Sequence, residues 1–175
     1  MALMQASATR YLFELGRADE ASERVVAAAR GGFVLPYDSL YIQGLARWAE
    51  NVVSIGDRVS ASDLYDRLLP YRAHLVNSGA IVIGSAEMFL GHLAGLLDRT
   101  DDAVDHFAKA VERHEAMSAP LFLARSHLYW AEMLIRLGQQ EEAADHLRRA
   151  AGLAGAHGGV SIERHCAELL AVITP

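Results

Sequence analysis

The sequence predicts an all-α protein built from a stack of about four helical hairpins. Three observations lead to this fold class. A short pattern, in which Gly or Asp stands five residues before an Ala, occurs four times along the chain. Apolar residues after each of these alanines recur at spacings of three and four, which is the period of an amphipathic helix. Gly and Pro residues separate the helical segments, as expected of helix ends and starts.

The four copies of this pattern mark the turn inside each hairpin. We call their alanines the marker alanines, and they follow one another at intervals of 40, 42 and 40 residues: Ala21, Ala61, Ala103 and Ala143. The turn residues five positions earlier are Gly16, Gly56, Asp98 and Gly138. Self-similarity at a nearly fixed interval is the signature of a repeat architecture. We therefore expect one helix before each turn and a second after it, and helix rather than strand throughout.

In chain order, nine segments have helical periodicity: 2–15, 18–30, 38–54, 60–69, 85–97, 101–117, 121–137, 140–156 and 161–172. Pro70 ends its helix early, so residues 71–84 are expected to form the least regular linker. We expect a single helical-repeat domain over 1–175. Its repeats are predicted at about 1–34, 35–78, 79–118 and 119–157, with a terminal helix at 158–175.

The residues that follow the marker alanines predict the core. The fourth residue after each marker is mostly large, and the seventh is mostly small, which lets the second helix of a hairpin lie close to the first. In the third hairpin, Ala103, Phe107 and Ala110 are expected to pack inside. Ala143 is expected at the close crossing of the fourth.

Composition limits the possible partners. The chain has 175 residues and a net charge of −6, so nonspecific attraction to a nucleic acid backbone is disfavoured and we expect no direct nucleic-acid binding. No stretch approaches the length of a membrane span, so no membrane association is expected. The single cysteine, Cys166, makes no intramolecular disulfide, which fits a cytoplasmic setting.

The titratable residues do not form a recognisable reaction centre. His106 with His114, or His157 with His165 and Cys166, could be imagined as metal ligands. Residues eight apart lie two helical turns away, however, which is too far for a paired zinc motif. Cys166 and His165 project in different directions around a helix, so they form no local nucleophile–base pair. We expect no enzyme activity, no catalytic residues, no metal and no cofactor.

The repeats resemble the tetratricopeptide family, which prefers Leu-Gly in the first helix and small and aromatic residues in the second. Leu90-Gly91, Ala103, Phe107 and Ala110 fit this pattern, whereas Trp48-Ala49 and Trp130-Ala131 stand where Leu-Gly is usual. The resemblance implies a right-handed solenoid.

The longer repeat is similar to the helical-repeat regions of large bacterial signalling ATPases of the maltose-activator type. The stretch from Leu68 to Leu97 also resembles actinobacterial regulators that carry a LuxR-type DNA-binding domain or a nucleotide-cyclase domain. This resemblance implies that the chain is a fragment of a transcriptional or signalling regulator. The sequence has neither a phosphate-binding loop motif nor a basic helix-turn-helix after the last helix, so ATP hydrolysis and DNA binding are not expected of this part.

The tetratricopeptide resemblance also implies a binding surface, because such solenoids bind partners on a concave side lined by the first helix of each pair. The positions eleven and seven residues before the marker alanines give mainly polar candidates. The positions one helical turn before the first of these sets give apolar ones. We call them the predicted stripe: Arg10, Glu14, Glu50, Met88, His92, Leu128, Glu132 and Arg136. Its polar members were expected to be exposed on a groove.

Two classes of function remain from the sequence. The first is a non-catalytic interaction or sensor module that binds a protein or peptide segment, possibly another domain of the same polypeptide. The second is a scaffold for homo-oligomers, in which the open edges of the solenoid stack on another copy. A small-molecule effector domain is a further alternative.

Overall fold

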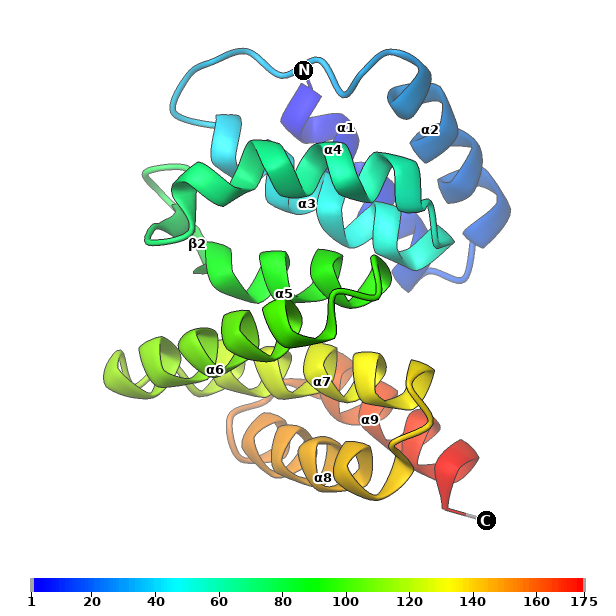
Figure 1. Ribbon diagram of the computed structural model, residues 1–175, viewed down its shortest axis with the longest axis vertical. Helices are drawn as coiled ribbons and strands as arrows, with labels where there is room; N and C mark the ends of the chain where they lie inside the picture. The colour runs from blue at the N-terminus through cyan, green and yellow to red at the C-terminus, as the bar shows by residue number, and fades with distance from the viewer. Residues whose placement is uncertain (1, 175) are drawn as a thin grey trace. The chain divides into compact units, whose positions relative to one another are not determined.

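The computed structural model describes residues 2–174 and is mainly α-helical (Figure 1). It comprises two compact units, Met1–Arg99 (unit 1) and Thr100–Pro175 (unit 2). Unit 1 contains α1 (Ala2–Glu14), α2 (Ala18–Arg30), α3 (Tyr41–Ile55), α4 (Arg58–Leu68), the short 3-10 helix η1 (Leu69–Tyr71), β1 (Leu75–Asn77), β2 (Val82–Ser85) and α5 (Ala86–Leu96). Unit 2 contains α6 (Thr100–Ala116), α7 (Pro120–Arg136), α8 (Gln140–Ala156) and α9 (Val160–Ile173). All nine predicted helical segments are confirmed, with ends that differ by at most three residues.

The four predicted turns are confirmed and share one backbone geometry. Gly16, Gly56, Asp98 and Gly138 have φ angles of 74°, 73°, 58° and 75°. This left-handed conformation favours glycine, which explains why three of the four are Gly. In each case the following residue donates its N–H to the carbonyl five residues earlier, as from Arg17 to Leu12 and from Gln139 to Leu134, both at 2.9 Å. The sequence repeat is therefore a repeat of the helix-ending hydrogen bond.

Helix α3 is central to unit 1 and contacts α1, α2, α4, α5 and β1. Its buried apolar residues include Leu45, Trp48 and Val52, and the Trp48 ring lies 5.4 Å from that of Phe33 in the loop after α2. The next helix starts at a side-chain cap, because Asp57 accepts hydrogen bonds from the N–H groups of Val59 and Ser60.

The expectation of helix throughout is wrong for the linker at 71–84. There β1 pairs antiparallel with β2, closed by a turn in which Asn77 Oδ1 accepts from the N–H of Gly79, whose φ is 82°. Val76 and Ile83 are buried whereas Ile81 is 61% exposed. Pro70 stops the helix, and the β-branched residues around a Gly-containing turn then favour a hairpin.

Helix α7 is central to unit 2 and contacts α6, α8 and α9. The predicted core residues Ala103, Phe107, Ala110 and Ala143 are fully buried, and the Phe107 ring of α6 stacks on Trp130 of α7 at 5.8 Å. The predicted third hairpin is divided between the units, since α5 belongs to unit 1 and α6 to unit 2.

Candidate functional site on the polar face of α3

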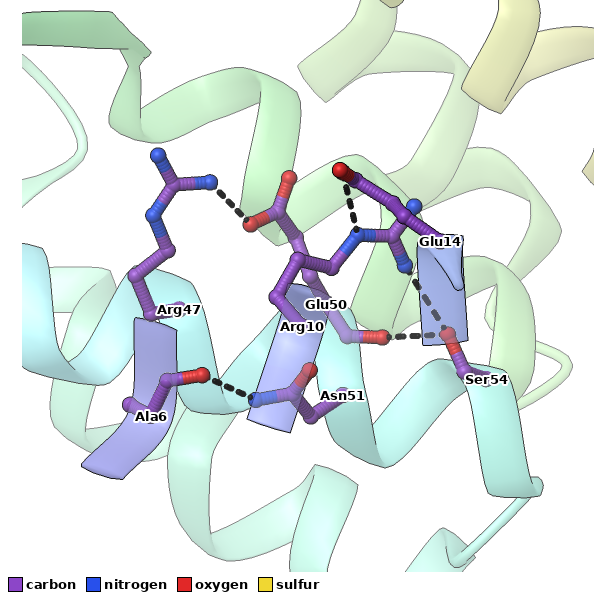
Figure 2. A network of polar contacts seen from close by, with 7 residues as sticks. All are labelled: Ala6, Arg10, Glu14, Arg47, Glu50, Asn51 and Ser54. Carbon is purple, nitrogen blue, oxygen red and sulfur yellow. Dashed lines mark hydrogen bonds and ion pairs between the residues drawn. The ribbon is translucent and has the colours of Figure 1, made fainter. Parts of the chain in front are cut away.

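Within unit 1, the first helices of the first two hairpins meet through polar contacts. Asn51 Nδ2 of α3 donates to the Ala6 carbonyl of α1 at 2.9 Å, and Arg10 Nη1 donates to Ser54 Oγ at 3.2 Å (Figure 2). From the first contact to the second, the contacting residue lies further toward the C-terminus on both helices, so α1 and α3 run parallel. Ala6 is fully buried, and its small side chain allows the close approach that these contacts need.

The polar residues of α3 lie on one side of the helix because they are spaced three and four apart. We call them the α3 polar face: Gln43, Arg47, Glu50, Asn51 and Ser54. A face of this kind is unusual in a helix whose neighbouring residues are Leu45, Trp48 and Val52, which form the core.

An ion pair lies at the middle of this face. Arg47 Nη1 contacts Glu50 Oε2 at 2.8 Å, with the Glu50 side chain 2% exposed and that of Arg47 20% exposed. At the α1 side, Arg10 Nε lies 3.7 Å from Glu14 Oε1, and Ser54 Oγ donates to the Glu50 carbonyl at 3.0 Å. Figure 2 shows these side chains and the contacts that join them.

Three atoms of the α3 polar face are buried without a hydrogen-bond partner among the described residues: Gln43 Oε1, Arg47 Nε and Asn51 Oδ1. Buried polar atoms usually have partners, so leaving these three unsatisfied costs stability. The arrangement alternates cation, anion and amide. This suits hydrogen bonding and ion pairing, and it offers no nucleophile with an adjacent base.

The structure brings together three members of the predicted stripe, Arg10, Glu14 and Glu50. The expected exposure is wrong for Glu50 and for His92 of α5, which are 2% and 5% exposed. The apolar members Met88 and Leu128 are likewise buried. In the interior of a helical stack a first helix has neighbours on several sides, so the same repeat position is covered rather than open.

The remaining members of the stripe lie in unit 2. Arg136 is exposed at the end of α7, and Glu132 Oε1 lies 3.0 Å from His165 Nε2 of α9. This hydrogen bond raises the pKa of His165, and the nearby Glu168 carboxylate adds to the rise.

Cys166, beside His165 in sequence, is fully buried. Burial, with the Glu132 carboxylate as a second cause, raises its pKa to about 11. The thiol is therefore protonated at neutral pH and is a poor nucleophile.

Sequence reasoning missed Arg47 and Asn51 as members of this site. The signal was present, since Gln43, Arg47 and Asn51 follow one another at four-residue spacing within an otherwise apolar helix. Reading that spacing as a buried polar stripe requires knowing that α1 covers it.

Comparison with protein-family models and with curated proteins gives no match to this chain. Among the described residues, no group of three or more His, Cys, Asp or Glu side chains is arranged to hold a metal ion. No helix in residues 2–174 combines the length and hydropathy that a membrane span requires.

Proposed function

We propose that this chain is a helical-repeat interaction module, a solenoid of the tetratricopeptide kind, whose first helices bind an extended protein segment. One observation carries the proposal. Arg10 and Glu50 stand eleven residues before their marker alanines, Glu14 and Ser54 stand seven before theirs, and all four belong to one polar network. Side-by-side first helices with equivalent positions in contact are the arrangement from which solenoids build their binding surfaces.

The chemistry of this network favours a polar segment carrying both signs of charge. The side chains of Arg10 and Glu14 are 29% and 47% exposed, so a partner can replace their mutual contact with its own carboxylate and ammonium or guanidinium groups. Such an exchange gives little net electrostatic attraction and mainly sets specificity. By the resemblance described above, the segment would come from another domain of the same regulator.

The test is selection of twelve-residue peptides from a displayed random library on the immobilised chain, followed by affinity measurement. We expect the selected peptides to lose at least about tenfold in affinity, roughly 1.4 kcal/mol, when Arg10 and Glu14 are both changed to Ala. The matched control changes Glu20 and Arg24, another i,i+4 ion pair with contact at 2.8 Å, on α2. Loss of binding in the control variant alone would place recognition on the second helices and contradict the proposal.

A second candidate, self-association, is favoured by the outer face of α1. Met4 and Tyr11 of α1, and Leu15 directly after its last residue, are 75%, 62% and 72% exposed. Together with exposed Ala8 they follow the three- and four-residue spacing of a helix-pairing seam. Sedimentation equilibrium distinguishes this candidate, because Tyr11→Glu would dissociate such a dimer and leave peptide binding unchanged.

A further inference from the structure

A row of four rings runs through unit 2 from α6 to α7, then to α8 and back to α7. The Phe107 ring stacks on Trp130, the Trp130 ring lies 4.4 Å from His146, and the His146 ring lies 5.0 Å from His127. His127 is 5% exposed and His146 is half-buried. The two imidazoles therefore form part of the packing between α7 and α8, with access to solvent at the His146 end.

The contact between these histidines depends on their protonation. Their Nδ1 atoms lie 2.9 Å apart, which is a hydrogen-bond distance. One ring must carry its proton on Nδ1 and the other must present a bare Nδ1, so the neutral pair holds two different tautomers. A first added proton on the far nitrogen of the donor ring leaves this bond in place. A second proton must go to the accepting Nδ1, which puts two N–H groups face to face.

We propose that the His127–His146 pair is a pH-sensitive contact that holds α7 against α8 while it carries at most one added proton, and that opens the hairpin when both rings are charged. The proposal does not depend on the interaction function proposed above.

The charges around the pair oppose its protonation. The pKa of each ring is lowered to about 4, with burial as the main cause. The neighbouring His146 is the second cause for His127, and Arg149 of α8 contributes to the lowering in both rings. Asp145, also on α8, acts in the opposite direction on His146 only. From α7 the pair meets Trp130, which is stacked in turn on Phe107 of α6. The titratable contact between α7 and α9 is a separate one, between Glu132 and His165.

The sign of the effect follows from these shifts. The folded pKa is below the unfolded value of about 6.5, so the closed hairpin is fully stabilised above pH about 6.5. Stability is lost as the pH falls from there toward 4, because the open form binds more protons. Near the middle of this range the open form binds almost two more protons than the closed form, so the open population rises on the order of 100-fold per pH unit there, and only about tenfold per pH unit near each end.

A nearby histidine provides an internal comparison. His114 of α6 is fully buried, and its Nδ1 lies 3.0 Å from Ser126 Oγ of α7. Burial also lowers the pKa of His114 to about 4. A hydroxyl can accept from a charged imidazole as well as donate to a neutral one, so the His114 contact survives protonation of its ring. The His127–His146 contact does not survive protonation of both of its rings.

The first experiment uses the unsubstituted chain and measures the imidazole ¹⁵N chemical shifts at pH about 7.5, well above the unperturbed histidine pKa. We expect one of His127 and His146 to be the Nδ1–H tautomer and the other the Nε2–H tautomer. The same tautomer in both rings would mean that the hydrogen bond does not exist, and the proposal would be overturned without any variant.

The second experiment measures the hydrogen-exchange protection of α8 amides between about pH 6.5 and 4, corrected for intrinsic exchange rates. In the parent chain we expect protection to fall by almost two powers of ten per pH unit near the middle of this range, the slope for about two protons, and by about one power of ten near each end. Asn places an amide where the imidazole has Nδ1, so His127→Asn with His146→Asn should keep a hydrogen bond and lose most of this slope. His157→Asn, at a position exposed near the end of α8, should retain it. Equal slopes in the parent and the double variant would overturn the proposal.

Discussion

Asn51 offers the sharpest test of how the α3 polar face contributes to stability. It is fully buried, its Nδ2 donates to the Ala6 carbonyl, and its Oδ1 has no partner among the described residues. Asn51→Leu removes both polar atoms and keeps a side chain of similar size. Asn51→Asp keeps the shape and places a carboxylate at the same buried position.

The sizes of the free-energy contributions decide whether each substitution stabilises or destabilises unit 1. Losing the hydrogen bond to Ala6 costs about 1 kcal/mol, whereas removing an unsatisfied buried acceptor recovers about 1–3 kcal/mol. Leu also has a higher helix propensity than Asn, by a few tenths of a kcal/mol. We expect Asn51→Leu to stabilise unit 1 by about 0.5–2 kcal/mol. Asn51→Asp should destabilise it by about 3 kcal/mol or more, since it buries a charge and places an oxygen against the Ala6 carbonyl to which Nδ2 donates.

Urea unfolding followed by Trp48 fluorescence measures both changes, because Trp48 is buried on the same helix. A loss of more than about 1 kcal/mol in Asn51→Leu would refute the reasoning. It would mean that Asn51 Oδ1 makes a good hydrogen bond in solution, as to an ordered water, whose removal carries the full desolvation cost.

Two further predictions concern unit 2. Ala143→Leu should destabilise it by about 1–3 kcal/mol, because Ala143 is fully buried on α8 and the packing has no room for a larger side chain; a thermal melt identical to that of the parent would contradict this. His165→Gln should lower the free energy of unfolding at about pH 5.5 and have little effect near pH 8.5. The pKa of His165 is raised in the folded protein, so its contribution to stability is complete below the unfolded pKa of about 6.5 and is lost as the pH rises through the folded pKa. The His165 side chain is 43% exposed, so the difference should be below about 1 kcal/mol. Urea titrations of both proteins at the two pH values measure it, and a larger loss at the higher pH would show that the sign is wrong.

The turns were predictable from the sequence because their cause is local. A left-handed residue at the end of a helix needs Gly, or a short polar residue such as Asp98, whatever surrounds it. The β-hairpin was missed because its residues were considered as a break between helices. Val76 and Ile83 fit the alternating pattern of a strand, but three- and four-residue strands give too short a pattern to outweigh a helical context.

The candidate site was predictable only in part. Repeat spacing predicts Arg10 and Glu50 at equivalent positions of α1 and α3, and these two helices lie in contact. It could not give exposure, which depends on how many neighbours cover each helix. For Glu50, a polar residue in an apolar surrounding is compatible with exposure on a groove. Burial with an ion-paired Arg47 gives the same sequence pattern, because a buried carboxylate also needs a partner at three- or four-residue spacing.

Cys166 makes the chain convenient for site-selective labelling. It is the only cysteine in the sequence, and it is buried with a thiol that stays protonated at neutral pH. A maleimide dye should therefore react first with a cysteine introduced on an exposed surface, and native Cys166 need not be removed beforehand. The slow rate at which Cys166 itself is labelled would then measure how often α9 separates from its neighbours, since the dye reaches this sulfur only in that open form.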